Sequence, residues 1–423
     1  MLQGCPTSPL LDPEVEDELS DDEQVIQLGF VIPEDEDYDD EEEPAFSTKL
    51  GGYPAWLCPD SAPKAEDISC GLCQKPMNFL MQIYTPEDHP PQAYHRALYI
   101  FICSSGSCVS KSRSQSIKAI RTQLPRDNAY YEPQELSTLQ DSNSKDTDDE
   151  KWSLKDTVDV EGKRCWVCGL FSSTRCSKCH KAQYCGRNHQ LRDWNLGNHR
   201  NTCLSGPSPP NFNATPLSGY PPRYIECESE KSGEEMARDE MKKVEGLMEQ
   251  VSISNDGGDK QLAVPGDEAY ENTKVEVDQA FLAFQRRIDY DPSQIIRYAR
   301  TNYGNDNVEP LWVSDIGKPA PTDILPCQIC GSTRVFEMQI LPQMLNFLPI
   351  DHSNPVALDW GTYIVYTCPE NCSPSAEDMT SCPDVLMGGG PSGKQSVYMS
   401  EVVWHQDFSS HGIGENIRKN HFS

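Results

Sequence analysis

The sequence predicts an α+β, β-rich fold in which two related β lobes flank a small inserted module and follow a disordered acidic tail. Three observations predict it. Cysteine and histidine gather in four closely spaced pairs between Cys165 and Cys203. One pattern of cysteines and strands occurs both before and after that segment. The first 48 residues hold 17 acidic side chains and neither lysine nor arginine.

The acidic tail is expected over residues 1–48, because a segment with so much charge and so few apolar residues cannot build a core. One apolar island, residues 25–31, could dock on the folded body as a strand or short peptide. Across all 423 residues the formal net charge is −30. That balance argues against direct nucleic-acid binding through phosphate attraction and favours a basic partner.

The 18 cysteines fit a reduced, metal-binding protein better than a secreted, disulfide-bonded one. The start of the chain lacks the basic and apolar regions of a signal peptide. No stretch reaches the roughly 18 apolar residues that span a bilayer. We therefore expect metal sites and no membrane segment.

The central segment supplies eight soft ligands, the number that two tetrahedral zinc ions need. So short a segment buries little core, and metal must replace packing. In a cross-braced finger the first and third pairs share one ion, which gives Cys165, Cys168, Cys185 and His189. The second and fourth pairs share the other ion, which gives Cys176, Cys179, His199 and Cys203. Tyr184 and Trp194 are expected to form a small apolar core, and His180 to lie on the surface.

The flanking blocks repeat a second pattern. In each block a CxxC pair is followed, eight residues after its second cysteine, by the sequence Met-Gln-Ile, at residues 81–83 and 338–340. An apolar strand then leads to another cysteine pair. Four thiolates from two pairs suit a closed zinc site. The expected ligands are Cys70, Cys73, Cys103 and Cys108 in the N-terminal lobe, and Cys327, Cys330, Cys368 and Cys372 in the C-terminal lobe.

Two alternatives remain for these lobe cysteines. They could be reduced thiols buried in β-structure, without metal. Cys58 could also replace one ligand of the first quartet. Upstream of the CxxC pairs, residues 317–321 resemble residues 51–56 more loosely, so we expect the two segments to be equivalent.

Helical spacing predicts a helix over residues 277–288, with Phe281 and Phe284 on its buried face. Pro292 could open a second helix through residue 298, with Asp291 as its N-cap. Residues 335–341 and 362–367 read as strands.

The domain boundaries follow from these changes in composition. We expect the tail over 1–48, the N-terminal β lobe over 49–131, a linker over 132–162 and the finger over 163–204. A linker with a charged insert follows over 205–266. The C-terminal lobe is expected over 267–408, joined by residues 220–230, with a tail over 409–423.

The central segment resembles the MYND zinc finger in its CxxC pairs, in Gln190 and Trp194, and in the spacing of its last histidine and cysteine. His189 departs from the general pattern, where cysteine is commoner. The fuller string from Cys179 to His199 is similar to the programmed cell death protein 2 family, which has histidine at that place. The resemblance extends to residues 49–57, 121–131, 224–230 and 292–298 and to the block at 327, so it covers most of 49–408.

The resemblance implies a non-enzymatic factor of the cytoplasm and nucleus. Members of that family act as chaperones or adaptors for a basic protein of the small ribosomal subunit, which has an Arg/Gly-rich tail and lies near the mRNA entry channel. They support its delivery into the nascent subunit and are linked to pre-rRNA processing, proliferation and apoptosis. An acidic chain suits such a client because it screens positive charge. Exposed β edges of the lobes could receive client strands. We expect a monomer.

Two other functions compete with this one. MYND fingers of some proteins bind Pro-Leu-containing corepressor peptides, so the alternative is a transcriptional adaptor that affects proliferation and apoptosis. Some MYND proteins are lysine methyltransferases. The sequence, however, shows neither a Gly-rich cofactor loop between strand and helix nor a catalytic Cys/His or Ser/His/Asp group outside the metal ligands. We therefore expect no enzyme activity.

Overall fold

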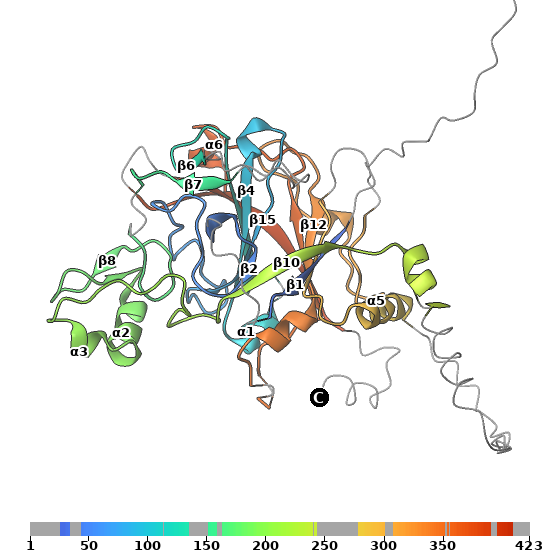
Figure 1. Cartoon of the computed structure of the whole chain (residues 1–423), viewed down its shortest axis with the longest axis horizontal. Helices are drawn as coiled ribbons and strands as arrows, with labels where there is room; N and C mark the ends of the chain where they lie inside the picture. Colours follow the sequence, from blue (N-terminus) through green and yellow to red (C-terminus); the bar gives the residue numbers. More distant parts are fainter. Residues whose placement is uncertain are drawn as a thin grey trace, which may run out of the picture.

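The computed structural model describes residues 26–33, 44–112, 114–134, 151–158, 163–239, 241–242, 278–300, 308–351, 353–354, 356–390 and 396–408. The rest of the acidic tail, most of the charged insert and the C-terminal tail lie outside these residues, so their expected disorder stays a prediction. Strands form most of the regular structure in the described part, with short helices around them (Figure 1). This confirms the β-rich fold class.

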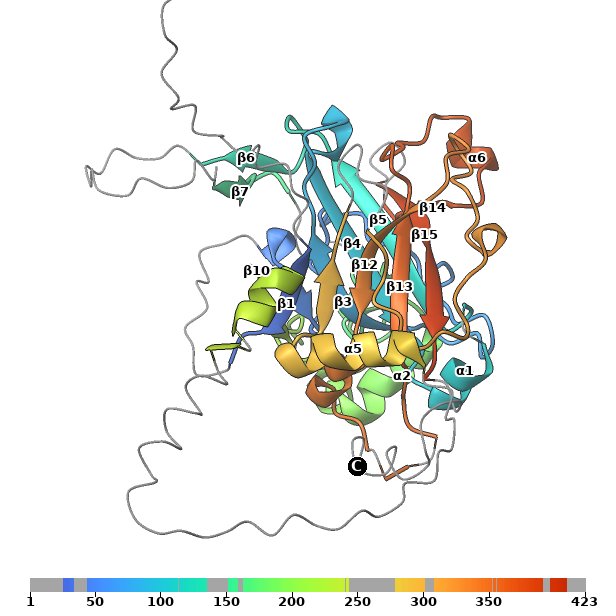
Figure 2. The same cartoon turned by 90° about the vertical axis from the view of Figure 1, so that its right-hand side faces the viewer.

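One antiparallel sheet organises the described residues. Its strands, in chain order, are β1 (Gln27–Val31), β2 (Lys49–Leu50), β3 (Asn78–Tyr84), β4 (His95–Ile102), β5 (Ile117–Leu124), β10 (Arg223–Ser229), β11 (Ile296–Tyr298), β12 (Val335–Ile340), β13 (Thr362–Thr367), β14 (Val385–Met387) and β15 (Val397–Gln406). Their order across the sheet is β13-β12-β11-β1-β10-β2-β3-β4-β5-β15-β14, and β13 also pairs with β15. That extra pairing closes ten described strands into a ring, with β14 attached outside it (Figures 1 and 2).

The two sequence repeats occupy equivalent places in this ring. β3 pairs with β4 in one half, and β12 pairs with β13 in the other. Both pairs carry a β-bulge at the same point of the motif, between Phe79 and Met81 and between Phe336 and Met338. A bulge bends a strand and increases its twist, as a closing sheet requires. The two lobes are therefore halves of one closed sheet.

A buried glutamine follows the bulge in each half. Gln82 accepts a hydrogen bond from the backbone N–H of Ala55 at 2.9 Å, and Gln339 accepts one from that of Leu311 at 2.9 Å. Leu311 is therefore the counterpart of Ala55. The predicted equivalence of residues 317–321 with residues 51–56 is wrong, because the segment around Leu311 takes the place of the one around Ala55.

The apolar island of the tail forms β1, as the sequence predicts, and it joins the two halves. β1 pairs with β10 along one edge and with β11 along the other. Leu28 is buried, and a Cβ on Gly29 would overlap the side chain of Ile296. The second junction between the halves is the pairing of β5 with β15. Closure of the ring thus depends on a strand taken from the tail.

A shared apolar core fills the ring. It includes Leu98 and Ile100 from β4 in the first half and Met338 and Ile340 from β12 in the second. Burying a side chain of this size contributes about 1.5–3 kcal/mol. Because residues of both halves make up this core, neither half can complete it alone.

A buried ion network crosses the core. Arg96 of β4 donates to both carboxylate oxygens of Glu337 in β12, with an Nη2–Oε2 distance of 2.7 Å. Arg300 donates to the same carboxylate at 3.0 Å and pairs with Glu87. Burial alone would raise the pKa of Glu337, but the two guanidiniums hold it at about 2. The carboxylate therefore stays charged between two arginines that lie far apart in the sequence.

A second buried network fixes the β5–β15 junction. Glu401 of β15 accepts from Arg121 of β5 at 2.8 Å and from Arg334 at 3.1 Å. Arg334 also donates to Asp384 at 2.7 Å. Each buried charge here faces an opposite charge, which is the condition for tolerating it in a core.

The helix predicted over residues 277–288 is confirmed as α5 (Gln279–Tyr290), with Asp278 as its N-cap and Phe281 and Phe284 buried. The second helix, predicted from Pro292, is wrong. Gln294 caps the end of α5 by donating to the carbonyls of Arg287 and Asp291, and the chain then enters β11. The short strand between β1 and β12 outweighs the local helix signal. No helix in the described residues has the length and apolar character needed to cross a bilayer.

The predicted linker 132–162 is described only at its two ends. There β6 (Tyr131–Pro133) and β7 (Trp152–Leu154) pair with each other. Trp152 stands edge-on to the His95 ring, with centroids 4.6 Å apart. The ends of this segment therefore pack on the first half of the sheet.

We predict that removing residues 1–31 destabilises the protein by on the order of 3 kcal/mol or more, because it removes buried Leu28 and leaves two strand edges unpaired. The matched control is removal of residues 1–24, which takes away acidic residues and keeps β1. Urea unfolding monitored by circular dichroism measures both. Equal stability of the two truncated chains would contradict the role given to β1.

Glu337→Gln should lower stability by about 3–5 kcal/mol, because it leaves the Arg96 and Arg300 guanidiniums buried without a full counter-charge. Glu377→Gln, at an exposed carboxylate, is the control. The folded-state pKa of Glu337 is about 2 and its ordinary value is 4.5. The stability gap should therefore be complete above pH 4.5 and shrink as the pH falls toward 2. A gap that does not change between pH 6 and pH 3 would refute this assignment.

Candidate metal centres and the finger junction

The structure brings the sixteen predicted ligands together as four quartets. They are Cys70, Cys73, Cys103 and Cys108; Cys165, Cys168, Cys185 and His189; Cys176, Cys179, His199 and Cys203; and Cys327, Cys330, Cys368 and Cys372. Within each quartet the ligand atoms all lie within 4.8 Å of one another. The grouping matches the cross-braced pairing in the finger and the two-pair arrangement in each half of the sheet.

The distances within the quartets fit zinc. A tetrahedral ion with Zn–S bonds of about 2.3 Å and Zn–N bonds of about 2.0 Å holds two sulfurs about 3.8 Å apart, and a sulfur and a nitrogen about 3.5 Å apart. Five sulfur–sulfur distances, with at least one in each quartet, are 3.7–3.8 Å. The sulfur–nitrogen distances are 3.2–3.6 Å, through Nδ1 of His189 and Nε2 of His199. Disulfides, at about 2.05 Å, are excluded.

The electrostatics of these sites also favour a bound cation. In the C-terminal quartet, burial and the neighbouring thiolate of Cys327 raise the pKa of Cys368 to about 11. Four thiols held this close can all ionise only when a cation neutralises them. Three sites with mostly buried cysteines and one with an exposed Cys330 thus share the chemistry of closed structural zinc sites. Zinc is the cofactor that this donor set fits.

All four CxxC pairs sit on the same backbone turn. The carbonyl of the first cysteine accepts from the N–H four residues later, as at Cys165 with Gly169. Its own N–H donates to the carbonyl five residues later in three of the turns, and six residues later, to Ala182, in the turn of Cys176. The residue four positions after the first cysteine has a left-handed φ in every case: Gln74, Gly169, His180 and Gly331. His180 therefore occupies a turn position and is exposed, as predicted, outside the quartets.

The second pair of each site comes from a nearby element. Cys103 follows β4, and Cys108 lies in α1 (Gly106–Lys111). Cys368 directly follows β13. In the finger, His189 belongs to α2 (Arg187–Leu196) and His199 opens α3 (His199–Thr202). The zinc sites of the two halves therefore tie the end of a long strand to a turn beside it.

Cysteines outside the quartets have other surroundings. Cys58 is buried among Leu57, Tyr130 and Tyr131, and burial raises the pKa of its thiol to about 12. It therefore stays a neutral thiol and does not replace a ligand of the first quartet. Cys227 is exposed, and Cys5 lies outside the described residues.

Tyr184 and Trp194 pack in an apolar cluster, as predicted, but this cluster continues into the first half of the sheet through residues such as Trp56. The side chain of Tyr184, in β9 (Gln183–Tyr184), is buried, and its hydroxyl donates to Asp193 of α2 at 2.7 Å. Trp194 is partly buried against the same cluster. Leu217, after the finger, packs there too, and its carbonyl accepts from Arg192.

The first half of the sheet holds the finger through its first zinc turn. The hydroxyl of Tyr53 donates to the carbonyl of Trp166 at 2.7 Å, and the indole N–H of Trp56 donates to that of Gly169 at 2.9 Å. The backbone N–H of Phe171 donates to the carbonyl of Pro63. All three finger residues lie in or next to the Cys165–Cys168 turn. Zinc binding at this site therefore also shapes the surface that docks on the sheet.

The sequence offered no role for these docking side chains. Tyr53 and Trp56 stand out only as aromatic residues beside glycine and proline, and their partners are backbone carbonyls 113 residues away. A backbone carbonyl can belong to any residue type, so the sequence does not show which one accepts. Only Gly169 hints at the contact, because a Cβ there would approach Tyr53 and Pro54 within 3.1–3.2 Å.

Comparisons with known proteins agree with this division. Residues 25–138 match the model of the programmed cell death protein 2 N-terminal domain, residues 278–407 that of its C-terminal putative domain, and residues 165–203 the MYND finger. The first match begins at β1. No solved structure matches the chain significantly.

Curated relatives cover most of the chain. Programmed cell death protein 2 of Bos taurus is 32% identical over 366 residues, which span 86% of this chain and 92% of the relative. Programmed cell death protein 2-like of Mus musculus is 29% identical, over 79% of this chain and 87% of the relative. The Schizosaccharomyces pombe protein named probable 20S rRNA accumulation protein 4 is 25% identical, over 82% and 92%.

Purified, reduced protein should contain four zinc ions per chain, measured by inductively coupled plasma mass spectrometry with protein quantified by amino-acid analysis. Cys330→Ser removes one ligand from a half-exposed site and should lower the content to three. Cys58→Ser is the matched control and should keep four, because Cys58 lies outside every quartet. Two ions per chain in the parent protein would confine zinc to the finger and contradict the lobe sites.

Proposed function

Because this chain belongs to the programmed cell death protein 2 family, we propose that it is a non-enzymatic chaperone or adaptor for a basic protein of the small ribosomal subunit. The client that fits is the protein with the Arg/Gly-rich tail near the mRNA entry channel. The chain would bind it in cytoplasm and nucleus and support its delivery during subunit assembly and pre-rRNA processing.

The observation that carries the proposal is the extent of the similarity to a protein named for 20S rRNA accumulation. The match spans 92% of that relative and 82% of this chain, so it includes the finger as well as both halves of the sheet. A shared finger alone would point only to a MYND protein. Similarity that extends over both halves of the sheet and their CxxC turns supports a common function.

Electrostatics support a basic client. The formal net charge is −30. Buried arginines such as Arg96 and Arg121 are paired with Glu337 and Glu401, so these pairs add no net charge to the field outside the protein. The acidic excess therefore lies on other residues, where it attracts positive chains and keeps them from non-specific contacts. Such binding weakens as salt screens it.

The closed sheet changes where a client strand could add. Each of the ten ring strands in the described part has a partner on both edges for at least part of its length. The expected strand addition to open lobe edges is therefore restricted there to short stretches, such as those of β3 and β10 beside the two-residue β2. Among the described strands of that sheet, β14 alone pairs on one side only. We therefore place the client on side-chain surfaces of the ring or on the edge of β14.

Affinity purification of the tagged chain from cells given a short pulse of labelled amino acids tests the proposal. A basic small-subunit ribosomal protein should be enriched among the newly made proteins, and it should dissociate as salt rises. Cys179→Ser, which removes a ligand from the finger site away from the sheet, should keep this client. Absence of any enriched small-subunit protein would refute the proposal. Enrichment of corepressor proteins that is lost with Cys179→Ser would favour the transcriptional adaptor instead.

A further inference from the structure

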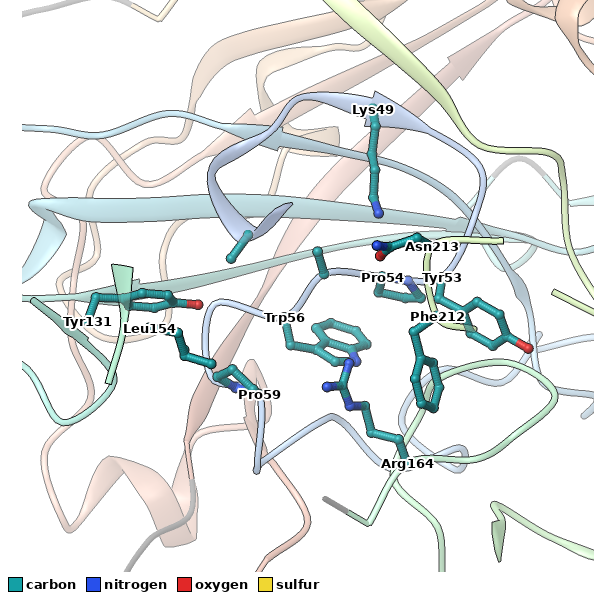
Figure 3. Close-up of a pocket in the computed structure, with 12 residues that line it drawn as sticks. Lys49, Tyr53, Pro54, Trp56, Pro59, Tyr131, Leu154, Arg164, Phe212 and Asn213 are labelled. Carbon is teal, nitrogen blue, oxygen red and sulfur yellow. The ribbon is translucent and has the colours of Figure 1, made fainter. Parts of the chain in front are cut away.

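A cavity of about 120 Å³ lies where the finger meets the first half of the sheet (Figure 3). Its walls come from separate parts of the chain: Lys49 of β2, Trp56 from the loop after β2, Tyr131 of β6, Arg164 beside the first finger cysteine and Phe212 from the segment after the finger. A water molecule needs roughly 10–15 Å³ of such space, so the cavity has room for a ligand group of several heavy atoms.

Among the described residues that line the cavity, two are positively charged and none is negatively charged. Lys49 and Arg164 both line it and are both buried, whereas none of its lining residues is aspartate or glutamate. Most of the remaining lining is apolar or aromatic. Lys49 therefore differs from the buried arginines Arg96, Arg121 and Arg334, each of which faces a carboxylate.

Lys49 is the most unusual of these residues. It is only 4% exposed, and within the described part of the chain its ammonium has no hydrogen-bond or ion-pair partner. Figure 3 shows its side chain extending from the strand toward the cavity. Burial, with the nearby Arg164 charge, lowers the pKa of Lys49 to about 8. An unpaired buried ammonium is destabilising, and a bound anion would remove that penalty.

We propose that this cavity binds a carboxylate carried on an apolar stem, such as an acidic side chain or the C-terminus of a peptide. Lys49 pairs with the carboxylate, and Arg164 adds a second positive charge. Trp56 and Phe212 contact the stem. A peptide carboxylate fits better than an ion without a stem, because apolar walls outnumber the polar groups.

The walls are held in place before any ligand binds. The indole N–H of Trp56 is fixed on the carbonyl of Gly169, and its ring lies 4.6 Å from that of Tyr99. The guanidinium carbon of Arg164 lies 4.8 Å from the centre of the Phe212 ring. A site with preset walls loses less conformational entropy on binding. The inference does not depend on the ribosomal client.

Lysine-selective NMR on the full chain tests the proposal. Protein labelled with ¹³C at lysine Cε reports each ammonium, and Lys49→Met identifies the signal. Without ligand, Lys49 should titrate near pH 8. Phenylacetate, a carboxylate on an aromatic stem, should bind in the millimolar range, shift this signal and move its midpoint upward. Phenylacetamide, the neutral counterpart, should leave it unchanged.

Two variants separate a binding role from a structural one. Lys49→Met should raise the melting temperature and abolish the stabilisation by phenylacetate, because it removes an unpaired buried charge. Lys118→Met is the matched control, at a lysine that donates to the carbonyl of Asp67 outside the cavity, and it should keep the response to phenylacetate. Three results would overturn the proposal: a lower melting temperature for Lys49→Met, equal effects of phenylacetate and phenylacetamide, or binding of phenyl phosphate alone.

Discussion

Closure of a single antiparallel sheet is the constraint on which the rest of this structure depends. A ring of strands has no free edges, but it forms only if every strand finds two partners. Here that requirement reaches across the whole chain, from β1 in the acidic tail to β15 near the C-terminus. The core inside the ring and the Arg96–Glu337 pair are both assembled from the two halves. Neither half can therefore be stable in this conformation without the other.

Zinc supports closure of the sheet at turns that have few apolar residues of their own. A CxxC turn has few apolar residues, and metal bonds replace the missing core. In each half, one quartet fastens the end of a central strand, at Cys103 after β4 and Cys368 after β13. In the finger, the first quartet also shapes the backbone carbonyls that Tyr53 and Trp56 hold. Metal binding at the first finger site therefore affects how the finger docks on the sheet. Docking in turn places the walls of the Lys49 cavity.

Sequence alone predicted the features that rest on local spacing. The four quartets follow from short cysteine and histidine intervals, and α5 follows from its apolar period and Asp278 cap. The repeat predicted matching strands, because Met-Gln-Ile follows the CxxC pair by the same interval in both copies. These signals need no knowledge of the fold, since each consists of short fixed intervals or of a pattern that occurs twice.

The features that sequence missed are long-range or carried by the backbone. Arg96 and Glu337 are 241 residues apart, and neither has a neighbour that marks it as part of a pair. Residues 296–298 form a strand because they pair with β1 on one edge and with β12 on the other. Local propensity does not predict such long-range pairing. Closure itself depends on the register of β1, a five-residue strand inside an acidic tail.

Three buried arginines and one buried lysine of the described residues differ in how their charge is compensated. Arg96, Arg121 and Arg334 each face a carboxylate, so their burial is compensated within the fold. Lys49 is compensated by nothing in the described residues, and it lies where the finger, the sheet and the β6–β7 pair meet. A ligand that binds only this assembled junction stabilises it by RT ln(1 + [L]/Kd). By linkage, a firmly docked finger then raises affinity for the ligand by the same factor. An unpaired charge at a junction is therefore the feature that makes docking responsive to a partner, whereas the same charge inside the ring would only weaken the fold.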